Sequence, residues 1–342
     1  MFSGHADFLL EYRAVNKTTV LVLMSPESDS AARYRKAVES RPSLRDRVQL
    51  MFAKSSEALG VIEGAEVVVC AKLPPELLPA AGRLRWISFW SAGLDKAITP
   101  EMEARRLLLT NASGVHGPNI AEQVLAWMLM FSRRMPDLFR AQLAREWKSA
   151  REVPPDELTG RTLGIAGFGR IGEALAVRAR AFGMRIVASK RDTTRRYDAS
   201  VAPDALYSAD QLPEMLAESD HVCVAIPLTP NTHHLFDSDL IAHMKPGAYF
   251  YNVSRGKLVD EAALIAALRE GRLAGAGLDV FETEPLPAES PLWGMENVII
   301  TPHVAGLTPH YFTRAAALFA DNLERYLAGE PLENLYDAKR GY

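Results

Sequence analysis

The sequence contains little cysteine and no long hydrophobic run. Its 342 residues include two cysteines, Cys70 and Cys223, and each lies within an apolar, strand-like segment. This setting is typical of buried thiols in a reducing compartment, not of a disulfide or a metal-binding pair. No apolar run approaches the roughly 18 residues that cross a bilayer, and residues 1–17 lack the apolar core of a secretory signal. We therefore expect a cytoplasmic protein with no metal site and no membrane segment.

The chain also lacks a strong excess of charge of either sign. Its formal net charge is −3, which argues against general binding to nucleic acid or to a membrane surface. A cluster of Arg191, Arg195 and Arg196 could indicate RNA or DNA, but aromatic residues do not interleave with it. A solvated or phosphate-facing loop is the better interpretation of that cluster. The length is typical of two domains of ordinary size.

Short apolar runs alternate with helical patterns along the chain. The first series predicts strands at residues 19–23, 48–52, 67–70, 86–89 and 107–110, with helices at 31–39 and 75–81. The second series predicts strands at residues 162–166, 185–189, 221–226, 248–253, 276–280 and 298–301. Such alternation is typical of parallel sheets that helices cover on both faces, and the second series fits a doubly wound dinucleotide domain.

Three helical segments carry further information. Residues 119–134 are apolar almost all round, which predicts burial in a core or at a subunit interface. Residues 260–270 begin with an acidic cap and end before Gly271, as stable helices do. A last amphipathic helix, at about 311–327, ends at Gly329, and its pattern does not say which domain it packs against.

The segment GFGRIG at residues 167–172 follows an apolar strand and opens a helix. In that context the three glycines form a dinucleotide site: one permits the tight turn, one admits the pyrophosphate, and one lets the helix pack on the strand. The helix N-terminus then favours the negative charge of the pyrophosphate. The alternative is a tight strand-to-helix turn with no ligand.

Three predicted strands end in residues suited to acid–base chemistry: Arg255, Glu284 and His303. Ligands of doubly wound sheets bind at the carboxyl ends of the strands, so we expect these side chains to converge. A guanidinium grips a carboxylate or polarises a carbonyl, a histidine transfers a proton near neutral pH, and a carboxylate orients the imidazole and favours its charged form. The trio therefore suits hydride transfer to a 2-oxo acid. Taken singly, each residue could instead be structural.

These motifs together resemble the D-2-hydroxyacid dehydrogenase family, and the resemblance covers nearly the whole chain. The matching segments are 167–172, PLTPNT at 227–232, NVSRG at 252–256, GLDVF at 277–281 with EPLP at 284–287, and TPH at 301–303. The family implies two doubly wound α/β domains with parallel sheets. A Rossmann dinucleotide-binding domain of residues 113–307 would be inserted into a flavodoxin-like substrate domain of residues 1–112 and 308–342. It also implies a homodimer through the 119–134 helix.

The resemblance assigns roles to individual residues. Arg255 would bind and polarise the substrate, His303 would be the acid/base, and Glu284 would hold the histidine. The N–H groups of Ala92 and Gly93, in the loop WSAGLD at 90–95, would receive the substrate carboxylate, although a plain turn is the alternative. The cofactor would contact Gly167, Gly169, Arg170, Ile171, Gly172, Ser189, Lys190, Arg191, Pro227, Thr232, Val253, Asp279 and Gly306, with Asp279 near the nicotinamide carboxamide. The implied substrate is a small 2-oxo acid, such as glyoxylate or hydroxypyruvate.

One position departs from the usual NAD-binding pattern. Many such domains carry an acid about 18 residues after the last motif glycine, where it binds the ribose 2′-hydroxyl, but this chain has Lys190 followed by Arg191. Cations cannot accept those hydrogen bonds, but they can bind a 2′-phosphate. The sequence therefore favours NADP over NAD, unless Asp192 takes the ribose. A binding module that responds to NAD(H) without turnover, like the corepressors of this fold, is the alternative function.

Overall fold

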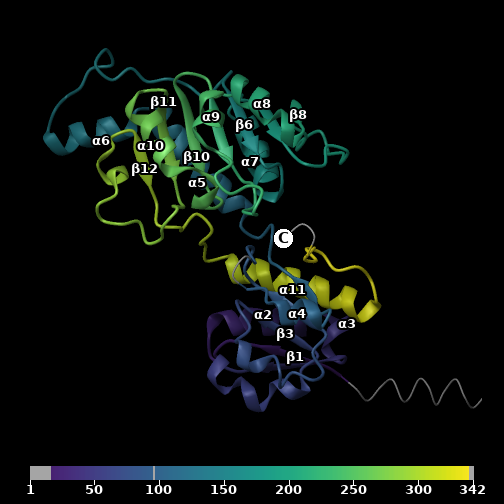
Figure 1. Cartoon of the computed structure of the whole chain (residues 1–342). Helices are drawn as coiled ribbons and strands as arrows, with labels where there is room; N and C mark the ends of the chain where they lie inside the picture. The colour runs from purple at the N-terminus through teal and green to yellow at the C-terminus, as the bar shows by residue number, and fades with distance from the viewer. Residues whose placement is uncertain (1–16, 95–96, 339–342) are drawn as a thin grey trace, which may run out of the picture. The chain divides into compact units, whose positions relative to one another are not determined.

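The computed structural model describes residues 17–94 and 97–338. The chain divides into two units by its internal contacts (Figure 1): unit 1 takes the described residues of Met1–Val115 and Thr308–Tyr342, and unit 2 is His116–Leu307. The prediction about a secretory signal falls almost wholly on residues 1–16, outside the described ranges. Among the described residues, no helix has the length and apolar character needed to cross a membrane.

Unit 1 contains a five-stranded parallel sheet in the order β2-β1-β3-β4-β5, which is the flavodoxin-like order. Its strands are β1 (Thr18–Val22), β2 (Val48–Phe52), β3 (Val67–Cys70), β4 (Trp86–Phe89) and β5 (Leu108–Thr110). β3 and β4 are buried along their whole length, as their unbroken apolar runs predict for a sheet covered on both faces.

Helices cover this sheet. They are α2 (Asp29–Glu39), α3 (Pro42–Arg45), α4 (Pro100–Ala104) and α11 (Tyr311–Ala328), with 3₁₀ turns η1 (Ser55–Gly60), η2 (Ile62–Gly64) and η3 (Pro75–Leu77). The C-terminal α11 packs in unit 1, where Phe319 stacks on Trp86 with ring centroids 5.4 Å apart. The helix predicted at residues 75–81 is wrong, because only the turn η3 forms. Pro79 has no N–H group with which to continue the helix.

Unit 2 contains a seven-stranded parallel sheet in the order β12-β11-β10-β9-β6-β7-β8. Its strands are β6 (Thr162–Ala166), β7 (Arg185–Ser189), β8 (Ala205–Tyr207), β9 (His221–Val224), β10 (Ala248–Asn252), β11 (Leu273–Leu278) and β12 (Val298–Ile300). The order reverses between β6 and β9, which is the switch point of a Rossmann sheet. The predicted doubly wound fold is confirmed. The prediction missed only the short, half-buried edge strand β8.

The helices of unit 2 cover both faces of its sheet. They are α5 (Gly117–Ser132), α6 (Met135–Ala144), α7 (Arg170–Arg180), α8 (Leu212–Glu218), α9 (Ser238–Ala242) and α10 (Glu261–Arg269), with turns η4 (Ala209–Gln211), η5 (Gly256–Leu258) and η6 (Pro291–Gly294). The apolar α5 lies mostly inside this unit: Trp127 and Phe131 are buried beside the sheet. A Cβ at Gly277 would lie 2.6 Å from the Trp127 ring. This glycine therefore lets the indole lie directly on β11.

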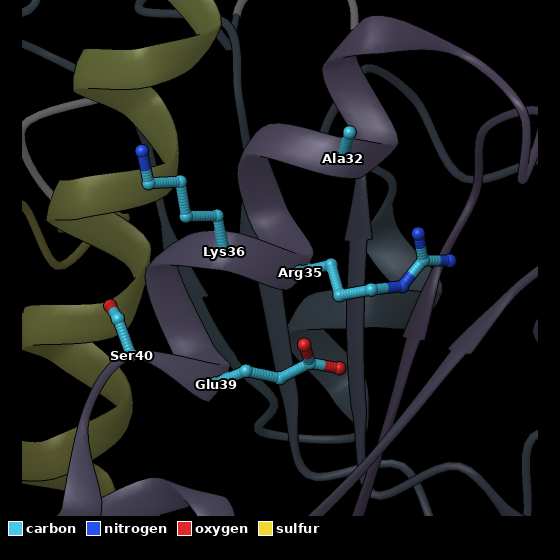
Figure 2. Close-up of a pocket in the computed structure, with 5 residues that line it drawn as sticks. All are labelled: Ala32, Arg35, Lys36, Glu39 and Ser40. Carbon is cyan, nitrogen blue, oxygen red and sulfur yellow. The ribbon is translucent and has the colours of Figure 1, made fainter.

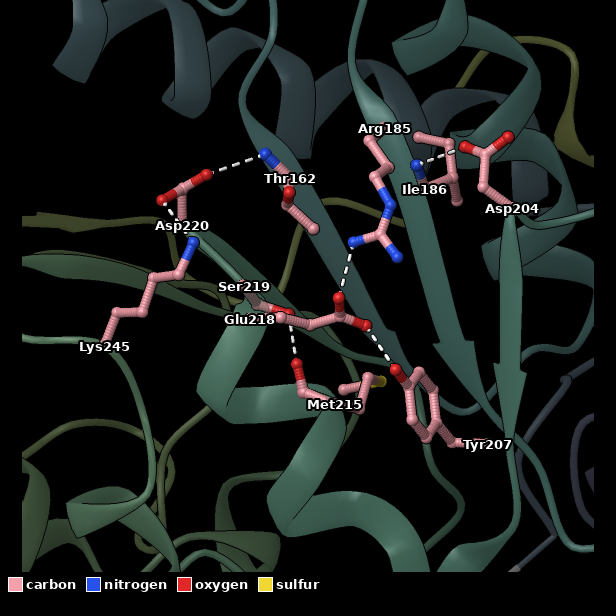
Figure 3. A network of polar contacts seen from close by, with 10 residues as sticks. All are labelled: Thr162, Arg185, Ile186, Asp204, Tyr207, Met215, Glu218, Ser219, Asp220 and Lys245. Carbon is pink, nitrogen blue, oxygen red and sulfur yellow. Dashed lines mark hydrogen bonds and ion pairs between the residues drawn. The ribbon is translucent and has the colours of Figure 1, made fainter.

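Polar contacts tie the amino ends of several strands together (Figure 3). Asp220, just before β9, accepts from the Thr162 N–H at 2.8 Å and from Lys245 at 2.9 Å. Glu218 accepts from Arg185 at 2.6 Å, and the Asp204 carboxylate receives the Ile186 N–H at 2.7 Å. This edge of the sheet is thus occupied by its own network, and the opposite, carboxyl edge carries the site residues.

Candidate active site

The three motif glycines of unit 2 occupy three different environments. Gly167 has φ 97°, and a Cβ there would lie 2.6 Å from the Ala225 carbonyl oxygen. A Cβ at Gly172 would lie 3.0 Å from the Ile165 side chain of β6, whereas one at Gly169 meets nothing within 4 Å. Gly167 therefore makes the turn, Gly172 packs the helix on the strand, and Gly169 leaves space at the N-terminus of α7. That space fits the pyrophosphate of a dinucleotide.

The end of β7 supports this turn and carries the cationic pair. The buried Ser189 accepts hydrogen bonds through its carbonyl oxygen from the N–H groups of Gly167 and Phe168, at 3.1 and 3.0 Å. Lys190 donates to the Tyr197 hydroxyl at 2.7 Å. Arg191 and Asp192 are exposed. One Asp192 oxygen accepts from both the N–H and the hydroxyl of Thr194, so this carboxylate is engaged within its own loop.

The loop after β9 closes on itself. The Thr232 hydroxyl donates to the Pro227 carbonyl oxygen and accepts from the Thr229 N–H, both at 2.8 Å. The Ser254 hydroxyl donates to the Ile226 carbonyl oxygen, so this loop is also tied to the loop after β10. These hydrogen bonds hold the loop that contains Pro227 and Thr232 at the carboxyl edge of the sheet.

The loops after β10 and β11 pack without a gap. The buried Asn252 accepts from the Ser254 N–H at 3.1 Å and donates to the Arg255 carbonyl oxygen at 3.0 Å, which shapes the loop that carries Arg255. A Cβ on Gly256 would lie 1.8 Å from the carbonyl carbon of Phe281. Only glycine allows the two backbones to approach this closely. Val253, between these residues, is buried.

His303 and Glu284 form a direct pair. The imidazole Nδ1 lies 2.8 Å from a Glu284 carboxylate oxygen, and the other oxygen accepts from the Phe281 N–H at 3.1 Å. Both side chains remain partly exposed, at 49% and 37%. His303 has φ 54°, a left-handed conformation that is uncommon outside glycine and often occurs at functional sites.

The pKa of Glu284 reflects its surroundings. Partial burial alone would raise this pKa, but hydrogen bonds from His303 and from the Phe281 N–H lower it below its usual value. The positive charges of His303 and Arg255 act in the same direction. The lowered pKa keeps the carboxylate ionised beside the imidazole. The structure thus brings His303 and Glu284 into direct contact, and the charge of Arg255, from the neighbouring loop, acts on the same carboxylate.

Asp279 fixes the backbone that presents His303. Its carboxylate is 2% exposed and accepts from the Thr301 hydroxyl at 2.5 Å and from the N–H groups of Val304 and Ala305 at 2.9 and 3.0 Å. A role beside the nicotinamide carboxamide stays a prediction. In the same loop, the Gly306 carbonyl oxygen lies 3.0 Å from the imidazole Nδ1 of His116.

The predicted substrate loop lies in unit 1, after β4. Ala92 and Gly93 are partly buried, and within the described residues their N–H groups donate no hydrogen bond. The loop is anchored by the Trp90 N–H, which donates to the Cys70 carbonyl oxygen at 3.0 Å, and by the Tyr311 hydroxyl, which donates to the Trp90 carbonyl oxygen. Asp95 lies outside the described residues. Phe89, which precedes the loop, is a core residue.

A hollow of about 380 Å³ on unit 1 has a different character. Ala32, Arg35, Lys36, Glu39 and Ser40 line it, all from α2 or its C-terminal cap (Figure 2). Arg35 lies over the Phe52 ring at 4.8 Å, which accounts for its orientation. Because one helix face supplies every lining residue, this hollow gathers no chemistry from different elements. Elsewhere in the described ranges, no group of three or more metal-ligating side chains is found, and Cys70 and Cys223 are buried and free.

Sequence reasoning did not identify three residues that shape the site: Asn252, Gly256 and Tyr197. The first two lie within the segment NVSRG: Asn252 bonds within its own loop, whereas the approach of Gly256 to Phe281 becomes visible only when the loops after β10 and β11 are placed side by side. Tyr197 lies in an irregular loop with no periodic pattern. Its position beside the arginine cluster was the only available signal.

Known proteins of one family are similar to this chain. A family model described as the NAD-binding domain of D-isomer-specific 2-hydroxyacid dehydrogenases matches residues 125–305, more than half of the chain. A glyoxylate reductase of Korarchaeum cryptofilum is 39% identical over 263 residues, which cover 76% of this chain and 78% of that protein.

Two further relatives cover more of the chain. A glyoxylate/hydroxypyruvate reductase B of Shigella boydii is 37% identical over 298 residues, which cover 86% of this chain and 88% of that protein. The crystal structure of a D-isomer-specific 2-hydroxyacid dehydrogenase of Xanthobacter autotrophicus, in complex with NADPH and MES, is 33% identical. It superimposes with a TM-score of 0.78 and covers 94% of this chain and 99% of its own.

Proposed function

The chain belongs to the D-isomer-specific 2-hydroxyacid dehydrogenase family, and on this premise we propose that it reduces a small 2-oxo acid to the D-2-hydroxy acid with a nicotinamide cofactor. The observation that carries the proposal is the 2.8 Å pair between His303 and Glu284, within electrostatic reach of Arg255. The loops that carry these residues and the glycine turn all follow strands of the same sheet. The names of the relatives favour glyoxylate or hydroxypyruvate as the substrate.

Each side chain has a defined part in this reaction. When bound, the reduced nicotinamide supplies a hydride to the carbonyl carbon of the substrate. Glu284 holds Nδ1 of His303, so Nε2 of the imidazolium faces the substrate and donates a proton to the carbonyl oxygen. Arg255 polarises that carbonyl and binds the carboxylate. Binding of a substrate carboxylate by the N–H groups of Ala92 and Gly93, in unit 1, is a further part of the proposal.

NADPH is the preferred cofactor in this proposal. Lys190 and Arg191 follow β7, where a 2′-phosphate would lie, and one Asp192 oxygen is already engaged by Thr194. The Xanthobacter relative was crystallised with NADPH, which supports the same choice. The other proposed cofactor contacts are those predicted from the sequence, including Arg170, Ile171 and Gly306.

The test is the loss of nicotinamide absorbance with NADPH and NADH in parallel, against glyoxylate, hydroxypyruvate and pyruvate. Faster turnover with NADPH is expected. A double variant, Lys190→Glu with Arg191→Glu, should lose NADPH use far more than NADH use, and equal losses would refute the cofactor choice. Cofactor binding without turnover of any 2-oxo acid would instead favour a binding module. No observation on the described residues supports that alternative.

Unit 1 is proposed as the substrate domain and unit 2 as the dinucleotide-binding domain. The bounds predicted from the sequence, 1–112 with 308–342 and 113–307, lie within three residues of the two units. The matched family model falls wholly within unit 2.

A homodimer is also part of the proposal, with the contact shifted from α5 to α6. The large apolar side chains of α5 mostly face the core of unit 2, whereas α6 and the segment after it expose Leu138, Phe139, Leu143 and Trp147. Trp147 is 96% exposed, which is unusual for a monomer surface. Light scattering of the purified chain should give twice the monomer mass, and a monomer would refute this part.

A further inference from the structure

We propose that Tyr197 is a specificity-determining residue for the cofactor, and that it positions the Lys190 ammonium for the 2′-phosphate of NADPH. The inference rests on the proposed function and deepens it, because it assigns a second role at the same site. Tyr197 lies in the irregular segment between β7 and β8, seven residues after the lysine.

Tyr197 is held on the dinucleotide turn itself. Its ring meets Phe168, the residue between the first two motif glycines, edge to face with centroids 5.1 Å apart and an interplanar angle of 76°. Phe168 is 1% exposed and belongs to the core of unit 2. The phenol is therefore anchored on the rigid part of the site, although its own segment has no regular structure.

The lysine is bound to this phenol by a hydrogen bond. Its ammonium donates to the Tyr197 hydroxyl at 2.7 Å. This contact reduces the freedom of a flexible side chain. Lys190 is thus preorganised, which lowers the entropy that a ligand would have to overcome.

This hydrogen bond holds the Lys190 ammonium in place without neutralising its positive charge. Among the described residues Lys190 forms no ion pair, whereas Arg195, which lies 5.0 Å from the same ring, pairs with Glu173 at 3.1 Å. A carboxylate in place of the phenol would hold the ammonium equally well, but it would cancel the charge that attracts a phosphate. A neutral partner retains that charge in full.

The Tyr197 hydroxyl can also donate a hydrogen bond. Because its oxygen accepts from Lys190, its own hydrogen is directed elsewhere and can donate to an anion. Lys190 and Tyr197 together offer a charge and a hydroxyl donor to a phosphate dianion, which binds such groups strongly. The neutral ribose 2′-hydroxyl of NAD gains much less from the same pair, so the arrangement discriminates between the two cofactors.

The experiment compares Tyr197→Phe with the wild-type chain. This change keeps the ring on Phe168 and removes only the hydroxyl. We expect KM for NADPH to rise about tenfold, KM for NADH to change less than twofold, and kcat to stay nearly constant. The matched control is Tyr207→Phe, because the Tyr207 hydroxyl binds Glu218 and not a cation. The control should leave both KM values unchanged.

Binding is measured independently of turnover by calorimetry with adenosine 2′,5′-bisphosphate and with AMP. Tyr197→Phe should weaken the bisphosphate about tenfold and leave AMP unchanged. If the wild-type chain prefers NADPH but Tyr197→Phe leaves its preference intact, or weakens both ligands equally, the inference fails and the proposed function stands. If the wild-type chain binds AMP and the bisphosphate equally, both the cofactor proposal and the inference fail.

Discussion

Replacing Gly256 with alanine should impair catalysis more than it impairs folding. The new Cβ would lie 1.8 Å from the carbonyl carbon of Phe281, 2.0 Å from its oxygen and 2.4 Å from the Glu282 nitrogen. Atoms without a bond between them need more than about 3 Å, so one backbone must move by more than about 1 Å. Overpacking of this kind typically costs about 1–3 kcal/mol.

The displacement reaches the reacting groups on both sides. Arg255 precedes the glycine, and the Phe281 N–H holds Glu284, which in turn holds His303. A shift of about 1 Å in a catalytic group can cost about 100-fold in rate. We therefore expect Gly256→Ala to lose about two orders of magnitude in kcat/KM for glyoxylate, and to lower the unfolding temperature by only several degrees.

Steady-state kinetics and a thermal unfolding curve measured on the same preparation separate the two effects. Gly294→Ala is the matched control, because a Cβ at Gly294 meets nothing within 4 Å and its backbone is not left-handed. This control should retain the kinetics and stability of the wild-type chain. A Gly256→Ala variant with wild-type kcat/KM would show that the contact between the two loops does not position the site.

Three other outcomes follow from the structure. His303→Ala should lower turnover about 10²–10⁴-fold in single-turnover assays, and near-full activity would reject its role as the acid. Glu284→Gln removes the carboxylate that holds Nδ1 of His303, so kcat should fall about 10-fold or more with little change in KM; an unchanged kcat would count against the pair. Burial lowers the pKa of His221 from 6.5 to about 4, so the unfolded chain binds its proton more readily. The free energy of unfolding should then fall by about 3 kcal/mol between pH 6.5 and 4. Urea titrations of His221→Asn should lack this part of the slope, and a slope equal to that of the wild-type chain would contradict the assignment.

The sequence predicted those parts of the site that depend on strand ends. Parallel strands bring their carboxyl ends to one edge, so the sequence alone groups Arg255, Glu284 and His303. The roles of the three motif glycines followed from the same local logic. The contact between His303 and Glu284 and the conformations of the glycine turn agree with this logic, because strand, turn and helix are encoded within a few neighbouring residues, whereas the chemical roles stay predictions.

Contacts between separate loops could not be predicted. The close approach at Gly256 depends on the packing of β10 against β11, and a glycine after a strand usually indicates only a turn. Tyr197 reaches Lys190 through a segment with no repeating pattern. The short strand β8 pairs along three residues, too few for an alternation to be visible. The location of α5 was ambiguous for another reason, because an all-apolar helix suits a core and a subunit contact equally well.

The path of the chain through unit 1 has a consequence for protein synthesis. The first five strands leave the ribosome early, but α11, which covers Trp86 and Val20 with Phe319 and Leu323, is made only after the whole of unit 2. At ordinary translation rates that interval is roughly 10 to 40 s. Throughout it, that face of the first sheet has only the partial cover that α2 and α3 supply, whereas the uninterrupted unit 2 can fold as it emerges. A nascent chain stalled before Tyr311 would therefore present a folded unit 2 and a first sheet with exposed apolar side chains. Chaperones and proteases recognise such exposed apolar surface.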